Sequence, residues 1–114
     1  MKITNLTRKN ILATNAKIAS FFLARMIGLI GRKSLGASEA LVITRCHSIH
    51  MFFMRFPIDV VFIDEKERVV GLVENIKPFQ MSRIFWKANR AIELPVGTIS
   101  KLGVKITDNL RFDK

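Results

Sequence analysis

Short apolar segments separated by polar breaks make up most of the chain, and the clearest of them lie near its middle. Residues 58–64 (IDVVFID) and 68–76 (RVVGLVENI) are rich in Val and Ile and are joined through the polar run DEKER, which predicts two strands in a hairpin. Both predicted strands are apolar on both faces. We therefore expect the hairpin near the centre of a layered structure and not at an exposed edge.

The same pattern predicts further strands on either side of this hairpin. Strands are predicted at residues 40–43 (ALVI), 91–95 (AIELP) and 104–112 (VKITDNLRF), and residues 11–19 (ILATNAKIA) are expected to form a strand or a loop. The connections are too short to place a long helix between most strands, which argues against a doubly wound α/β fold. The sequence thus predicts a mainly β fold, a small sandwich or partly open barrel of short strands with one or two short helices.

Two segments carry the signals of those helices. Apolar residues recur at spacings of three and four in residues 21–31, and Ser20 can cap a helix there. Near the end of the chain, Thr98 is expected to cap a short helix over residues 99–102, which Gly103 would end.

The length of 114 residues is typical of one domain, and 49% of the residues are hydrophobic, enough for a packed core. No linker, repeat or low-complexity segment interrupts the chain. We therefore predict a single domain over residues 1–114, in which residues 1–19 form a strand or loop extension.

The longest apolar segment near the start, residues 18–31, is interrupted by Arg25 and is shorter than the roughly 20 residues needed to cross a bilayer. It also lacks the clean apolar stretch of a signal peptide. Cys46 is the only cysteine, so no intramolecular disulfide can form. These features predict a cytoplasmic protein without a transmembrane segment.

A strong positive charge distinguishes the chain: 19 Lys and Arg against nine Asp and Glu give a formal charge of +10. Such a charge favours encounter with anions, including nucleic acid, phosphorylated metabolites, acidic partners and membranes. A basic surface that serves solubility alone is the alternative, because no recognised nucleic-acid motif accompanies the charge.

Five ordered segments carry a family resemblance: GLIGRKSL, IHMFFMRFPIDVVFID, VVGLVENIKPF, AIELPVGT and LGVKITDNL. In this order they resemble the family called domain of unknown function 192, from about Phe21 onward. The resemblance implies a compact, mainly β single domain with short helices, and it implies no particular reaction. The family's polar or special motif positions correspond here to Gly28, Arg32, His50, Met54, Pro57, Asp59, Glu93, Pro95 and Gly97.

The chain departs from the family pattern at two turns. After the GRKSL element the family has a proline and a Gly-Glu-Gly-like turn, where this chain has GASEA at residues 36–40. The family's last segment has Gly-Asp, where this chain has Thr107 and Asp108. The role of these turns, loop closure or ligand contact, is open from the sequence.

The only cysteine and both histidines lie close together, at Cys46, His47 and His50. A zinc site would need four ligands, or three and a water, so Asp59 or another carboxylate would have to complete the set; we predict no metal and no cofactor. Cys46 and His50 are four residues apart and can share a face, which leaves a thiolate nucleophile with a histidine base as an alternative.

His50 and Asp59 form the more informative pair. If the segments that carry them are neighbouring strands, the carboxylate can orient the imidazole for acid–base catalysis, or the two can form a buried structural hydrogen bond. Asp59 lies in an apolar segment, so its carboxylate is expected to need a partner. The sequence leaves open whether the protein is an enzyme.

Our leading hypothesis is a binding module whose polar cleft is built from His50, Arg55, Asp59 and Glu93. These residues lie between apolar strands and would suit a small or extended ligand that is anionic or hydroxylated. Its identity is unknown from the sequence.

The segment 77–90 (KPFQMSRIFWKANR) is the best candidate for nucleic-acid binding, because basic residues follow phosphates while aromatic side chains stack on bases. Its candidate contacts are Arg83, Trp86, Lys87 and Arg90. The alternative is a loop whose aromatic side chains anchor it to the core and whose charges face water.

Overall fold

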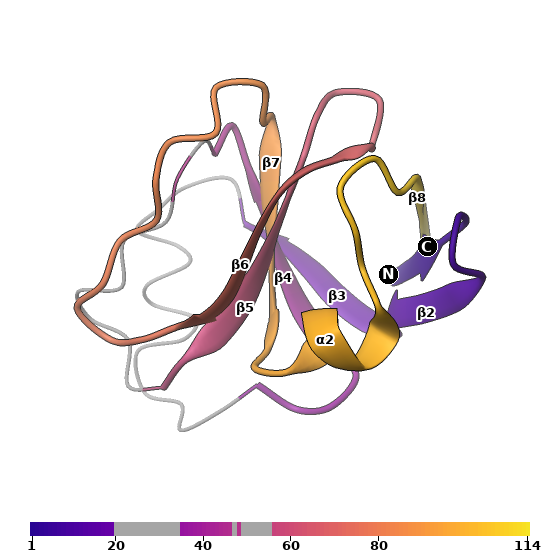
Figure 1. Cartoon of the computed structure of the whole chain (residues 1–114). Helices are drawn as coiled ribbons and strands as arrows, with labels where there is room; N and C mark the ends of the chain where they lie inside the picture. Colours follow the sequence, from indigo (N-terminus) through magenta and orange to yellow (C-terminus); the bar gives the residue numbers. More distant parts are fainter. Residues whose placement is uncertain (20–34, 47, 49–55) are drawn as a thin grey trace.

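The computed structural model describes residues 1–19, 35–46, 48 and 56–114, which form two β-sheets and a short helix (Figure 1). The elements within these residues are β1 (Lys2–Asn5), β2 (Asn10–Ala13), β3 (Asn15–Ala19), β4 (Glu39–Thr44), β5 (Ile58–Ile63), β6 (Val69–Ile76), β7 (Arg90–Pro95), α2 (Thr98–Leu102) and β8 (Leu110–Asp113).

The larger sheet has the strand order β3-β4-β7-β5-β6, and the smaller has the order β2-β1-β8. Strands β3 and β4 are parallel, whereas the other neighbouring pairs are antiparallel. Within the described residues neither sheet closes on itself, so the arrangement is a two-layered one and not a closed barrel. This confirms the predicted mainly β fold with a short helix.

Most of the predicted strands are present. Residues 11–19 contribute to β2 and β3, and the segments 40–43 and 91–95 lie within β4 and β7. The predicted hairpin is β5 and β6, which pair antiparallel. The helix predicted over residues 21–31 lies outside the described residues.

The expected central position of this hairpin holds for β5, an inner strand of the larger sheet, but is wrong for β6, which is an outer strand. Burial on both faces reports what covers a strand above and below, and not whether its second edge is paired. The start of β6 is protected by the turn that precedes β8: the Val69 N–H donates to the carbonyl of Asp108, and the Thr107 N–H donates to the carbonyl of Val69. Such cover limits pairing with other chains.

The last predicted strand is shorter than expected, since only Leu110–Asp113 is extended. Before it, the Asp108 carboxylate accepts a hydrogen bond from the Lys105 N–H at 2.9 Å, and the Asp108 N–H donates to the carbonyl of Lys105 at 3.1 Å. These bonds form a turn at residues 105–108 in place of a strand.

Thr107 adopts a φ of 76° in this turn, which is unfavourable for a β-branched residue. The replacement Thr107→Gly is expected to raise the free energy of unfolding by about 0.5–1 kcal/mol, because relief of roughly 1–2 kcal/mol of backbone strain exceeds the entropic cost of glycine. Urea denaturation measures the change. Lys105→Gly, at an exposed neighbour without a positive φ, is the control and should destabilise the protein. A loss of stability in both variants would contradict the prediction.

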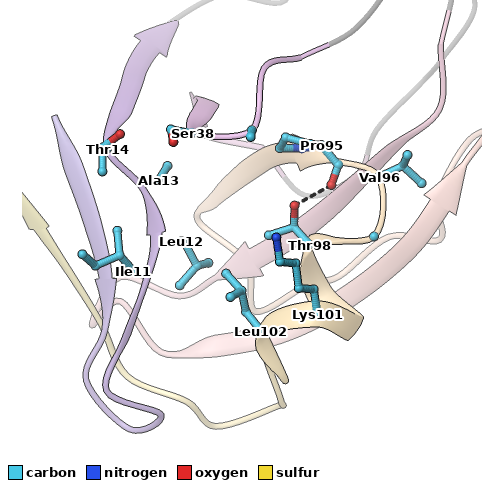
Figure 2. Close-up of a pocket in the computed structure, with 12 residues that line it drawn as sticks. Ile11, Leu12, Ala13, Thr14, Ser38, Pro95, Val96, Thr98, Lys101 and Leu102 are labelled. Carbon is cyan, nitrogen blue, oxygen red and sulfur yellow. Dashed lines mark hydrogen bonds between the residues drawn. The ribbon is translucent and has the colours of Figure 1, made fainter.

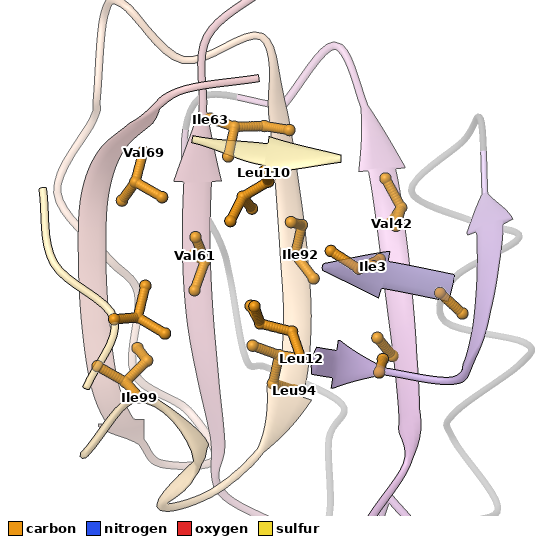
Figure 3. Packing of buried hydrophobic residues seen from close by; sticks show 14 residues of the cluster. Ile3, Leu12, Val42, Val61, Ile63, Val69, Ile92, Leu94, Ile99 and Leu110 are labelled. Carbon is orange, nitrogen blue, oxygen red and sulfur yellow. The ribbon is translucent and has the colours of Figure 1, made fainter. Parts of the chain in front are cut away.

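The larger sheet carries a hydrophobic core on each face. Val61 and Ile92 point to the face that the smaller sheet and α2 cover, where they meet Ile3 and Leu110 (Figure 3). The alternate positions of the same strands, such as Phe62, contribute to a second cluster on the opposite face. All six residues of β5 are buried, so this strand is the centre of both cores.

Phe85, from the loop between β6 and β7, closes part of the second core. Its ring stacks on Phe62 with centroids 4.5 Å apart, and it lies over Gly71, which pairs with Phe62 across the strands. A Cβ at Gly71 would lie 2.4 Å from the Phe85 ring, so only glycine fits there without a shift.

Gly71→Ala is therefore expected to lower the free energy of unfolding by about 1–3 kcal/mol, because the partly buried Phe85 ring must move. Chemical denaturation, with the near-ultraviolet circular dichroism of the aromatic residues, measures both effects. Gly36→Ala is the matched control: a Cβ there meets the flexible carboxylate of Glu39, so a smaller change is expected. Equal losses in the two variants would show that Phe85 is not the cause.

Candidate functional site

Asp59 lies in β5 on the face covered by α2, and its side chain is fully buried. Its Oδ1 atom accepts a hydrogen bond from the Asn75 N–H at 2.9 Å. Its Oδ2 atom accepts from the N–H groups of Gly97 at 3.1 Å and Ile99 at 2.9 Å. A buried carboxylate is thus satisfied by three backbone donors and ties β6 and the start of α2 to β5.

The expected capping of α2 by Thr98 is wrong. Gly97 is the N-cap residue, with a φ of 93° and no side chain to accept a hydrogen bond. The Thr98 hydroxyl donates instead to the Pro95 carbonyl at 2.6 Å. The carboxylate of Asp59, from the neighbouring β5, accepts the N–H groups of Gly97 and Ile99 at the start of the helix, which is the role that a local cap residue usually has.

Asp59 and Glu93 do not meet. Asp59 pairs with Leu94 across β5 and β7, whereas Glu93 pairs with Val60, so successive side chains place the two carboxylates on opposite faces of the sheet. Glu93 is fully buried on the second face, beside Leu41 of β4. The described residues therefore do not assemble a cleft from both carboxylates.

The remaining members of the predicted cleft, His50 and Arg55, lie outside the described residues, as does His47. The proposed pairing of His50 with Asp59 stays a prediction. Both oxygens of Asp59 already accept backbone hydrogen bonds, so acid–base work by this carboxylate would have to disturb the turn that it holds. The Cys46 thiol donates to the carbonyl of Ser48 at 3.0 Å.

The turn anchored by Asp59 forms one wall of a pocket of about 510 Å³, which we call the α2 pocket. This wall comes from residues 95–102, and the opposite side comes from residues 11–14 with residues 37–38 (Figure 2). Most of the lining is apolar, including Leu12, Val96 and Leu102. The polar side chains among the lining residues are Thr14, Ser38, Thr98 and Lys101.

Both walls of the α2 pocket are held by hydrogen bonds. The carbonyl of Ser38 accepts from the N–H groups of Thr14 and Asn15, at 3.0 and 2.9 Å, which joins the 36–40 turn to β2 and β3. The other wall is fixed by Asp59. The sequence did not predict this pocket, because residues far apart in the chain form it. Pro95, Gly97 and the divergent GASEA turn were recognisable as special positions, but not as neighbours.

The basic aromatic loop of residues 77–89 places three of its four predicted contacts together. Arg83, Trp86 and Lys87 line one hollow of about 250 Å³, and the Trp86 side chain is 78% exposed. Arg90 is separate, because it lies in β7, where its guanidinium is 3.3 Å from the Glu67 carboxylate and 4.9 Å from the centroid of the Phe112 ring.

No group of three or more His, Cys, Asp and Glu side chains able to hold a metal ion is present in the described part of the chain. None of its helical segments has the length and apolar character to cross a bilayer.

Two comparisons of sequence agree with each other. The profile of the DUF192 family, described as an uncharacterized ACR, matches residues 3–112. A UPF0127 protein of Thermococcus sibiricus is 32% identical over 115 residues, which are 97% of this chain and 74% of that protein. A UPF0127 protein of Pyrococcus furiosus is 30% identical over 113 residues, which are 96% of this chain and 97% of that protein.

Two crystal structures share the fold. A protein of unknown function from Novosphingobium aromaticivorans superposes with a TM-score of 0.81 at 20% identity, covering 97% of this chain and 82% of that chain. A Sinorhizobium meliloti protein, described as a candidate transcription regulator, gives a TM-score of 0.78 at 22% identity, covering 96% of this chain and 89% of that chain. At these identities the likeness concerns the fold. The match over residues 3–112 and the relatives at 30% identity and above show that the chain belongs to the DUF192 family.

Proposed function

We propose that the chain is a binding module whose ligand site is the α2 pocket, and that the ligand is small, with an anionic group and an apolar body. The observation that carries this proposal is the lining of the pocket: apolar walls with Lys101 as the charged side chain and three hydroxyl groups. The volume of about 510 Å³ falls within the range of small-molecule sites, roughly 300–1,000 Å³.

The chemistry of the lining selects the class of ligand. A lysine ammonium group binds a carboxylate or phosphate as a point charge, and hydroxyl groups add hydrogen bonds. No acidic side chain is among the described residues that line the pocket. The formal charge of +10 on the chain also favours encounter with anions.

Asp59 acts in this proposal as a positioning residue. Its bonds to Gly97 and Ile99 fix the turn that carries Thr98 and Lys101, so the polar groups of the pocket are arranged before a ligand arrives. A site built in advance loses less entropy on binding. In this proposal Asp59 supports binding of an anionic or hydroxylated ligand by holding the turn in place, and it does not contact the ligand.

Binding of octanoate, compared with 1-octanol, tests the proposal by nuclear magnetic resonance of the backbone amides. We expect octanoate to shift amide signals of Ser38, Val96 and Lys101, and shorter carboxylates to bind more weakly because they bury less apolar surface. Lys101→Gln is expected to weaken octanoate binding about tenfold, equivalent to about 1.4 kcal/mol, and to leave 1-octanol binding unchanged.

Lys105→Gln is the matched control, because Lys105 is exposed, carries the same charge and is not among the residues that line the pocket. It should change neither affinity. The proposal is wrong if octanoate shifts none of these signals, or if the two lysine variants lose affinity equally.

A further inference from the structure

A row of large apolar side chains is exposed on the loop of residues 77–89, which connects β6 to β7. Phe79 is 75% exposed and Trp86 is 78% exposed, and Met81 and Ile84 between them are exposed as well. In contrast, the two hydrophobic cores bury most of the large apolar side chains of the strands. Clusters of exposed apolar side chains commonly mark interaction surfaces.

The loop is anchored, so these side chains are presented from a fixed base. Phe85 packs on Phe62 and over Gly71, and the Asn89 N–H donates to a carbonyl of β5 at 2.7 Å. The Lys77 N–H also donates to the side-chain oxygen of a glutamine three residues later, at 2.8 Å. Phe85 therefore packs against the second core, while the adjacent Trp86 is exposed to solvent.

Cations flank the exposed ring. The hollow of about 250 Å³ beside it is lined by Val70, Arg83, Phe85, Trp86 and Lys87. The Arg83 guanidinium lies 4.9 Å from the centroid of the Phe85 ring, close enough for a cation–π contact. An aromatic face and two positive charges thus line the same depression.

A second hollow of about 430 Å³ continues this surface, since both hollows share Lys87. Its charged lining also includes Lys66 and Arg68 together with Asp64 and Glu65 from the turn between β5 and β6. Arg68 lies 3.5 Å from the Asp64 carboxylate. Across both hollows four cations face two carboxylates, which leaves the path positively charged.

We propose that this surface, the loop of residues 77–89 with the turn of residues 64–68, binds single-stranded nucleic acid. An unpaired base can stack on the exposed Trp86 ring, and Arg83 and Lys87 lie where they can neutralise the phosphates on either side. Adjoining hollows suit an extended strand, and a duplex hides the base faces that an aromatic ring needs. This surface is separate from the α2 pocket.

The fluorescence of Trp86 reports binding directly, because it is the only tryptophan of the chain. Titration of the whole protein with short oligothymidylate at low salt is expected to quench this fluorescence. The logarithm of the affinity should fall linearly with the logarithm of salt concentration, with a slope of about −0.7 for each phosphate neutralised. A duplex of the same length should bind more weakly.

Variants separate stacking from charge, with the anisotropy of labelled oligothymidylate as the readout. Trp86→Ala is expected to weaken binding at least about tenfold without changing the salt slope, since stacking contributes roughly 1–3 kcal/mol for each base. Arg83→Gln and Lys87→Gln should each make the slope shallower by about 0.7. Arg111→Gln, at an exposed arginine of β8, is the matched control and should change neither quantity.

Three outcomes overturn the proposal: no binding at low salt, equal losses in Trp86→Ala and Arg111→Gln, or quenching by anionic phospholipid vesicles but not by oligothymidylate. The last outcome would assign the surface to membranes. Lys101→Gln should leave oligothymidylate binding unchanged, so a failure of the α2 pocket proposal and a failure of this one are distinguishable.

Discussion

Asp59→Ala is expected to lower the free energy of unfolding by about 3–5 kcal/mol, the largest loss that we predict for one substitution. The change removes the acceptor of three N–H groups, those of Asn75, Gly97 and Ile99, and of these residues Ile99 is buried. A donor left without its partner costs about 1–3 kcal/mol where it is buried and less where water reaches it. Local rearrangement and entry of water reduce the sum. Urea denaturation at neutral pH measures the difference.

A less disruptive variant and a surface control make this result specific. Asp59→Asn keeps one oxygen acceptor and nearly the same shape, so a smaller loss of about 1–3 kcal/mol is expected. Asp113→Ala removes the same charge at an exposed site, where the ion pair with Arg111 contributes little. If Asp59→Ala costs no more than Asp113→Ala, the carboxylate does not hold the turn.

The second large effect is expected at Asp108, which is 1% exposed and joins the two ends of the chain. Its Oδ2 atom accepts hydrogen bonds from Asn5 Nδ2 at 2.9 Å and Arg8 Nε at 3.2 Å. Another bond comes from the Lys105 N–H at 2.9 Å. Asp108→Ala should lower the free energy of unfolding by about 2–4 kcal/mol, because it leaves the buried amide of Asn5 unpaired and breaks the hydrogen bond that closes the 105–108 turn. The part due to Arg8 is small, since that side chain is 37% exposed.

The contribution of Asp108 should also depend on pH. Burial raises the pKa of this carboxyl, but the hydrogen bonds from Asn5, Arg8 and Lys105 and the charge of Arg8 outweigh burial and hold the pKa below the ordinary value of 3.8. A carboxylate whose pKa is lower in the folded protein stabilises it above the unfolded pKa, and this contribution is lost as the pH falls from there through the folded pKa.

Urea denaturation at a series of pH values between about 7 and 3 tests this dependence. The free energy of unfolding of the wild type should fall more steeply below about pH 4 than that of Asp108→Asn. Asp64→Asn serves as a comparison, because the pKa of Asp64 is also lowered in the folded protein. Burial raises the pKa of Asp64, but the N–H groups of Arg68 and Lys66 and the Arg68 side chain lower it below 3.8. Parallel pH curves for wild type and Asp108→Asn would contradict the assignment.

The strands of the fold were largely predictable, because a strand with a buried face has apolar residues at the positions that point to that face. The apolar segments that became β4, β5, β6 and β7 were recognisable without any contact information. Their order was not, because the pairing of β7 with both β4 and β5 brings together strands that are distant in the chain. For the same reason the outer position of β6 escaped prediction.

The site shows the same division. That a carboxylate at Asp59 needs partners followed from its apolar neighbours, but the partners are backbone N–H groups located 16, 38 and 40 residues away. Every residue except proline carries a backbone N–H, so the residue types do not show which N–H groups bind the carboxylate. The separation of Asp59 from Glu93 likewise depends on the register between β5 and β7, which places successive side chains on opposite faces.

The sequence by itself determined the mainly β fold class, most strands, the family and the basic aromatic loop, since these depend on local composition, alternation and the order of motifs. The tertiary structure alone decided which polar groups meet. It assigned Asp59 to the turn before α2, paired Arg90 with Glu67 and not with the hollow of Trp86, and formed the α2 pocket from three distant segments. The physical reason is that non-local pairing and register, rather than local preference, position side chains relative to one another.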